Sequence, residues 1–124
     1  MKNIDIETSN LKEIGNYGEN IAVKFLEKNN YLIISKNFLC NQGEIDIIAK
    51  KEEEIIFIEV KTRTNKKYGN PREAVTFYKK NHIWKSAKYF LYINNLMNRY
   101  IRFDVIEIFI NKNKTYINHI KNIM

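Results

Sequence analysis

The chain has 124 residues, which suits one domain with a real hydrophobic core and is too short for two. Hydrophobic residues make up 44% of it and aromatic residues 13%, which predicts a folded globule and excludes a disordered chain. The 21 Lys and Arg against 14 Asp and Glu give a net charge of +7. This charge favours a polyanion such as nucleic acid as the partner, although an anionic membrane or solubility alone would also explain it.

A single cysteine, Cys40, excludes an intrachain disulfide and a Cys-rich zinc site, and it fits an intracellular protein. The polar segment 1–9 lacks an apolar signal core, and we interpret it as a loose leader. The longest apolar runs are far too short to span a membrane. We therefore expect a soluble, cytoplasmic protein with no membrane partner, and the oligomeric state stays open.

The first half of the chain predicts one helix and three strands. Apolar residues recur at helical spacing from Asn10 to Asn29, which indicates an amphipathic helix. Runs typical of strands follow at 31–38, 44–49 and 55–63.

The short polar link between the second and third strands favours an antiparallel hairpin. If Glu52 and Glu53 form its tip, Asp46 falls directly opposite Glu59 on the same face of the sheet.

The second half predicts a helix and two more strands, which gives the order αβββαββ. A helix start is indicated by Asn70 as N-cap, Pro71 as the first helical residue and Glu73 two positions later. Thr76 is a second possible cap, before a longer helix. The expected apolar face of that helix, which places its tryptophan in the core, consists of Ile83, Trp84, Ala87, Phe90 and Leu91. Strands are expected at 101–110 and 115–120.

The residues most relevant to chemistry lie on the predicted hairpin. Residues two apart in a strand share a face, so Glu59 and Lys61 project together, and Asp46 joins them from the neighbouring strand. Two carboxylates on one face suit a hard divalent cation, and a nearby lysine can hold a water or neutralise a phosphate. A structural ion pair of Lys61 with Glu59 or Asp46 explains the same spacing, so the pattern alone leaves both interpretations open.

Five stretches, in order from about Gly15 to Ile106, carry a resemblance to a known family: "GNYGENIAVKFL", "NFLCNQGEIDIIA", "FIEVKTR", "YGNPREAVTFYKK" and "IRFDVI". They resemble the YraN-like family of small bacterial proteins. Asp46 followed by Glu59-Val60-Lys61 is similar to the Asp…(Asp/Glu)-x-Lys motif of the restriction-endonuclease-like nucleases. The resemblance implies a single α/β domain over residues 1–124, with a mixed sheet flanked by helices.

The resemblance also implies roles for individual residues. Asp46 and Glu59 would bind Mg²⁺ or Mn²⁺, joined by the Val60 backbone carbonyl, and Lys61 would assist the attacking water. Glu19 matches a glutamate on the first helix of resolvase-like nucleases that helps to complete the site; an exposed helix acid is the alternative.

Basic residues near this motif are candidates for phosphate contacts. Arg63 continues the face of Glu59 and Lys61, and Lys79 and Lys80 open the long helix, where the helix N-terminus favours anions. A solvated basic face is the alternative for each of them.

The sequence therefore predicts a metal-dependent endonuclease acting on DNA, in branched or damaged structures. The alternatives are a non-catalytic nucleic-acid-binding module that keeps the fold, and an interaction protein in which the charged residues form ion pairs.

Elsewhere, Asp104 is expected to pair with Arg102 on its own strand, and His82 and His119 are interpreted as surface residues.

Overall fold

The computed structural model describes residues 10–64 and 77–124, without the side chains of residues 77–79. Its elements, in order, are α1 (Leu11–Lys28), β1 (Leu32–Cys40), β2 (Gly43–Lys51), β3 (Glu54–Arg63), α2 (Phe77–Ile93), β4 (Tyr100–Asn111) and β5 (Lys114–Ile120). This confirms the predicted order αβββαββ. The predictions for the leader 1–9, for the helix start at 70–73 and for Thr76 lie outside the described residues.

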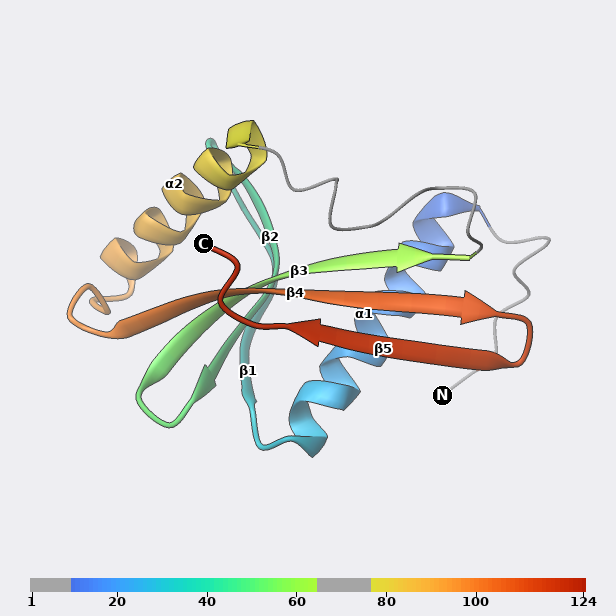
Figure 1. Cartoon of the computed structure of the whole chain (residues 1–124). Coiled ribbons are helices and arrows are strands. Elements are labelled where there is room, and N and C mark those ends of the chain that lie inside the picture. Colours follow the sequence, from blue (N-terminus) through green and yellow to red (C-terminus); the bar gives the residue numbers. More distant parts are fainter. Residues whose placement is uncertain (1–9, 65–76) are drawn as a thin grey trace.

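The five strands form one mixed sheet in the order β1-β2-β3-β4-β5 (Figure 1). β3 and β4 run parallel, whereas the β1–β2, β2–β3 and β4–β5 pairs are antiparallel. Parallel neighbours need a crossover connection, and the segment that contains α2 provides it. The predicted class, an α/β fold with a mixed sheet flanked by helices, is confirmed.

The two helices cover opposite faces of the sheet, and the alternation of residues along β3 decides which core each residue joins. Ile56 and Ile58 pack under α1, together with Leu26, whereas Ile55 and Phe57 pack under α2. All of these side chains are almost completely buried. Truncating Leu26 to alanine would cost about 2–5 kcal/mol.

Asparagines define both ends of α1. The Asn10 side chain accepts a hydrogen bond from the Glu13 N–H at 2.8 Å, which satisfies one of the free donors of the first turn. At the other end Asn30 takes the left-handed conformation (φ 67°), and the Tyr31 N–H donates to the Leu26 carbonyl at 3.0 Å. This is a Schellman motif with Asn in place of the usual Gly, and it turns the chain directly into β1.

Close packing fixes the position of α1 over β3. Gly18 is buried on the sheet side of α1, and a Cβ there would overlap with Oγ1 of Thr62. Only a glycine lets the helix backbone approach the strand so closely.

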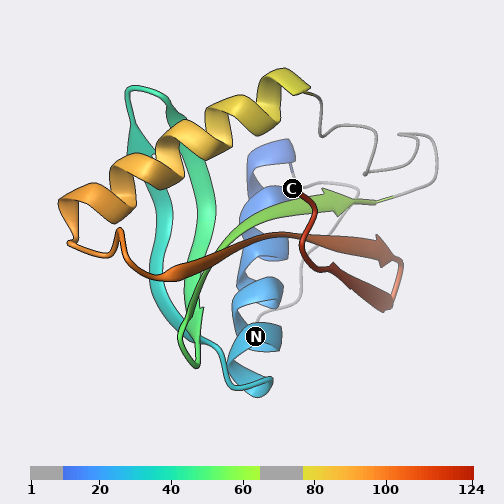
Figure 2. The ribbon, with the colours of Figure 1, turned by 60° about the vertical axis from the view of Figure 1, so that its left-hand side comes forward.

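The β2–β3 hairpin has the predicted register. Its pairs run from Ile47 opposite Ile58 to Lys51 opposite Glu54, so Glu52 and Glu53 form a two-residue tip. Beyond Ile47, the β1–β2 hairpin bends toward α2 while β3 continues beside β4 (Figures 1 and 2). The bent end is held by His82 of α2, whose Nδ1 lies 2.7 Å from the Gln42 carbonyl oxygen.

The predicted apolar face of α2 is correct except at Trp84. Ile83, Ala87, Phe90 and Leu91 are buried, but Trp84 is 40% exposed. The Trp84 ring rests edge-on against Phe103 with centroids 5.8 Å apart, so it lies at the rim of the core rather than inside it. The expectation that Trp84 is a core residue is therefore wrong.

Candidate metal and phosphate site

Asp46 lies at the point where β2 and β3 part. The paired register ends at Ile47 and Ile58, and one further step would set Asp46 opposite Glu59. At this point a side chain of β2 replaces a backbone carbonyl as the hydrogen-bond acceptor for β3. The Oδ2 of Asp46 accepts a hydrogen bond from the Val60 N–H at 2.8 Å. The carboxylate is thus fixed beside the motif on β3, as the sequence predicts.

Glu59 and Lys61 share one face of β3 and form an ion pair. Lys61 Nζ lies 3.1 Å from Glu59 Oε1, and the two side chains are only 11% and 12% exposed. The alternative interpretation of the spacing, an ion pair between these two residues, therefore describes a real contact. It does not exclude a cation site, because the pair lies next to Asp46.

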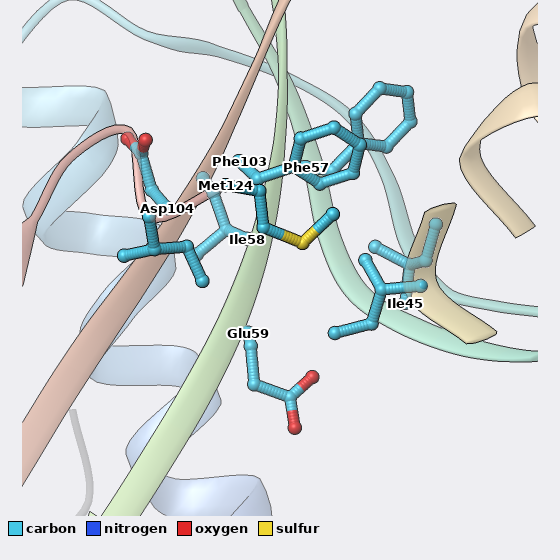
Figure 3. A pocket seen from close by; sticks show the side chains of 9 residues that line it. Ile45, Phe57, Ile58, Glu59, Phe103, Asp104 and Met124 are labelled. Carbon is cyan, nitrogen blue, oxygen red and sulfur yellow. The ribbon is translucent and has the colours of Figure 1, made fainter. Parts of the chain in front are cut away.

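A small cavity lies on the apolar side of Glu59. In Figure 3, the Glu59 carboxylate points away from Phe57, Phe103 and Met124, which line the other side of the cavity. Its volume of about 10 Å³ has room for about one water molecule. The carboxylate is therefore directed out of the apolar core, toward the opening between β2 and β3.

The electrostatics of Asp46 are unusual. Burial, followed by the charge of Glu59, raises the pKa of Asp46 to about 7, although the Val60 N–H bond acts in the opposite direction. The charges of Glu19 and Glu44 are smaller contributions to the same increase. The buried carboxylate thus lies among other carboxylates, an arrangement that costs folding free energy and that a cation would relieve.

Glu19 and Glu44 form the outer part of this acidic group. Glu19 on α1 is half-buried and faces the sheet, and burial, then the charge of Glu44, raises the pKa of Glu19. The interpretation of Glu19 as a simply exposed acid is wrong.

Asn37, for which no role was predicted, joins these two acids. With its amide oriented to donate, Asn37 Nδ2 lies 2.9 Å from Glu19 Oε1 and 3.1 Å from Glu44 Oε1. Asn37 also has φ 53° inside β1, a conformation that Asn adopts more readily than most residues. An asparagine in the middle of an apolar strand was the signal for this role.

The predicted phosphate-binding residues lie at two separate places. Arg63 ends β3, lines an open cavity of about 350 Å³ with residues of α1, and donates from Nη1 to the Thr62 carbonyl at 3.1 Å. Its Nε is buried without a hydrogen-bond partner among the described residues. Lys80 is partly exposed in the first turn of α2, and Lys79 belongs to the same turn, with a side chain outside the described residues.

A second polar cluster surrounds Asp104 on the α1 face. Arg102 donates to Asp104 at 2.9 Å from both Nε and Nη2, which agrees with the predicted pairing. His119 Nε2 lies 2.7 Å from Asp104 Oδ2, and its side chain is only 9% exposed. Burial raises the pKa of Asp104, but the bonds from His119 and Arg102 outweigh this effect and the pKa falls below its ordinary value.

His119 is therefore a buried partner of Asp104, and the expectation that it is a surface residue is wrong. His82 is partly exposed, and its Nδ1 contacts the Gln42 carbonyl oxygen of the β1–β2 hairpin.

The residues at the β2–β3 opening fit a hard divalent cation. Carboxylate and carbonyl oxygens with water are what Mg²⁺ and Mn²⁺ prefer, and Asp46, Glu59 and the Val60 carbonyl provide such donors. No three His, Cys, Asp or Glu side chains within residues 10–64 and 77–124 are grouped as a metal site. The fit thus depends on two carboxylates, one backbone oxygen and water.

The fold is an α/β fold in which helices flank a mixed five-stranded sheet. Residues 18–108 match the model of the uncharacterised protein family UPF0102, and the chain belongs to this family. This confirms the resemblance to the YraN-like group. The described part of the chain contains no helix long and apolar enough to cross a membrane.

Relatives from several bacteria are similar over almost the whole chain. A UPF0102 protein of Clostridium perfringens (strain 13) is 54% identical over 113 residues, which cover 90% of this chain and 93% of the relative. A UPF0102 protein of Caldicellulosiruptor bescii is 52% identical over 116 residues, covering 91% of this chain and 98% of the relative. Another, from Clostridium botulinum (strain Kyoto), is 50% identical over 101 residues, covering 81% and 82% respectively.

Proposed function

We propose that the protein is a divalent-cation-dependent endonuclease that hydrolyses phosphodiester bonds of DNA, in branched or damaged structures. The observation that carries this proposal is the buried carboxylate Asp46, held at the β2–β3 opening beside Glu59 with its pKa raised, mainly by burial, to about 7. A sheet built only for stability would gain by replacing such a group with a neutral one. A strongly perturbed acid with specific charged neighbours is typical of a functional site.

Different residues of the site would bind the cation and contact the attacking water. Asp46 and Glu59, with the Val60 carbonyl, would hold the cation, and the cation would polarise the phosphate and lower the pKa of a bound water. Lys61 lies beside the carboxylates, where its ammonium group can hold the attacking water and neutralise charge on the phosphate.

Other residues hold the site and the substrate in place. Glu19 and Glu44, bridged by Asn37, add negative potential beside Asp46 and strengthen its attraction for a cation. Arg63 at the end of β3, and Lys79 and Lys80 in the first turn of α2, would contact phosphates of the bound DNA.

A cleavage assay on linear, flapped and four-way-junction DNA, with Mg²⁺ or Mn²⁺, tests the proposal. We expect cleavage by the wild-type protein, and a fall of about 100-fold or more in Glu59→Gln and in Lys61→Gln. Glu53→Gln removes the same charge at the exposed tip of the β2–β3 hairpin and serves as the matched control. It is expected to cleave like the wild type.

Cleavage of none of these substrates, or cleavage unchanged by Glu59→Gln and Lys61→Gln, would overturn the proposal. The 3.1 Å ion pair between these two residues supports the second candidate, a nucleic-acid-binding module without catalysis. That candidate predicts DNA binding that falls steeply with salt and does not respond to divalent cations beyond their ionic strength.

A further inference from the structure

The outward face of α2 combines exposed aromatic rings with lysines. Trp84 is 40% exposed, Tyr89 45% and Tyr92 72%, and Lys85 and Lys88 are exposed between them. Exposed aromatics gathered on one helix are unusual, because large rings normally contribute to a core. The aromatic face of α2, defined by these five residues, is therefore a candidate interaction surface.

Rings and cations alternate along this face. Residues four apart in a helix are neighbours, so Trp84, Lys88 and Tyr92 form one ridge, and Lys85 and Tyr89 form the next. Lys88 Nζ lies 5.9 Å from the centre of the Trp84 ring. From Trp84 to Tyr92 the ridge rises about 12 Å along the helix axis.

The two rings at the flanks of this face are held by the core. Trp84 packs edge-on against Phe103 of β4, with centroids 5.8 Å apart, and Tyr89 tilts against Phe38 of β1 at 6.3 Å. Rings fixed in this way lose little freedom when a flat partner stacks on them. Tyr92 extends the surface to an open groove of about 720 Å³, lined by Tyr92, Ile93, Asn95, Met97 and Asn98.

The segment of the chain that forms this face carries charge of one sign. Residues 74–103 contain no Asp or Glu, although the whole chain has 14. The same stretch includes Lys80, Lys85 and Lys88. A surface that combines aromatic rings with only positive side chains complements a single nucleic-acid strand, which has phosphates and unpaired bases. A second copy of the same face would offer it no opposite charge.

We propose that the aromatic face of α2 binds single-stranded nucleic acid, with bases stacked on Trp84 and Tyr92 and phosphates held by Lys85 and Lys88. Duplex DNA does not fit this mode, because its bases are already stacked on one another and only its phosphates are accessible to the lysines.

The buried side of α2 reaches the core next to Glu59. Ile83, the residue before Trp84, lines the same small cavity as Glu59. We infer that a strand bound on the outward face of α2 continues to the β2–β3 opening, and this part of the inference rests on the proposed function. It names DNA with a single-stranded segment next to the scissile bond as the substrate class.

Fluorescence of Trp84 tests the inference directly, because Trp84 is the only tryptophan of the chain. The full-length protein is titrated in EDTA with a short single-stranded deoxyadenosine oligonucleotide, and with the same sequence as a duplex. We expect saturable quenching by the single strand and at least about tenfold weaker binding of the duplex. EDTA prevents metal-dependent cleavage, so binding is measured whether or not the protein is a nuclease.

Variants locate the binding on α2. Tyr92→Leu, at an exposed position, is expected to weaken single-strand binding about tenfold, and Lys85→Gln and Lys88→Gln to lower the slope of log Kd against log salt by about 0.7 each. Tyr116→Leu is the matched control, because Tyr116 lies on β5 and is 54% exposed; its affinity is expected to equal that of the wild type. Circular dichroism verifies that each variant is folded.

Several results would overturn the inference: no quenching of Trp84, equal binding of single strand and duplex, or unchanged binding by Tyr92→Leu. Self-association that Tyr92→Leu abolishes, without oligonucleotide binding, would assign the face to a second copy of the chain. Quenching by anionic vesicles but not by oligonucleotides would assign it to a membrane surface. A lack of cleavage with normal quenching in EDTA would refute the proposed function and leave the binding face established.

Discussion

Replacing Asp46 by asparagine removes a buried negative charge while it keeps the size of the side chain and an oxygen that can accept from the Val60 N–H. In the folded wild type, burial and the neighbouring charge of Glu59 raise the pKa of Asp46 to about 7, compared with 3.8 for an ordinary aspartate. At neutral or higher pH, keeping this carboxylate ionised in the folded state therefore lowers the free energy of unfolding. We predict that Asp46→Asn is more stable than the wild type at pH 8 without divalent cations.

The sign and size of the effect follow from proton linkage. Between about pH 4 and 7 the folded state binds a proton more tightly than the unfolded state, so the wild type loses stability as pH rises through this window. The shift of about three pH units sets an upper limit of about 4 kcal/mol. Because Asp46 and Glu59 share the repulsion, the expected gain at pH 8 is about 1–3 kcal/mol, and it vanishes near pH 4.

Urea unfolding at pH 8 and at pH 4, followed by circular dichroism, measures this gain. Asp104→Asn is the matched control of opposite sign, because Asp104 is buried but receives hydrogen bonds from Arg102 and His119. Its loss would leave Arg102 with only the more exposed Glu54 as ion-pair partner and cost up to about 3–5 kcal/mol at pH 8. A lower stability of Asp46→Asn at pH 8, or an equal gain at pH 4, would refute the reasoning.

Three further predictions concern stability. Gly18→Ala should destabilise the protein by about 1–3 kcal/mol, because the new methyl group overlaps with β3. Gly15→Ala, on the open side of α1, should stabilise it by about 0.5–1 kcal/mol. Equal effects of the two substitutions in urea unfolding would contradict this prediction. Glu52→Gly should raise stability by about 1 kcal/mol, because Glu52 has φ 54°, and Glu53→Gly should not; the thermal midpoint decides. Ser86→Ala should stabilise by about 1 kcal/mol, because the Ser86 hydroxyl is buried with no hydrogen-bond partner among the described residues, and a clear loss of stability would contradict this.

Much of the fold follows from local signals in the sequence. The two faces of β3 could be assigned because residues alternate along a strand, which puts Ile56 and Ile58 on the face opposite Glu59. The register of the β2–β3 hairpin followed from a two-residue tip, and that register brings Asp46 to the end of the pairing beside Glu59. The carboxylates of the site were therefore predictable as a pair.

Contacts between distant segments were not predictable in the same way. His119 lies 15 positions from Asp104, and only the pairing of β4 with β5 brings the two together. The bridge by Asn37 depends on a left-handed residue inside β1, and periodicity does not reveal such a residue. Trp84 sits at one flank of the apolar stripe of α2, and helical spacing alone does not separate a rim position from the core.

The most direct test of the account is a crystal of the protein soaked in Mn²⁺, with the ion located by its anomalous scattering. We expect one strong peak between the carboxylates of Asp46 and Glu59, near the Val60 carbonyl, and no peak there in a crystal of Asp46→Asn. A wild-type crystal without this peak, in which Lys61 still holds Glu59 as its ion-pair partner, would contradict the account and identify the charged residues as a structural pair.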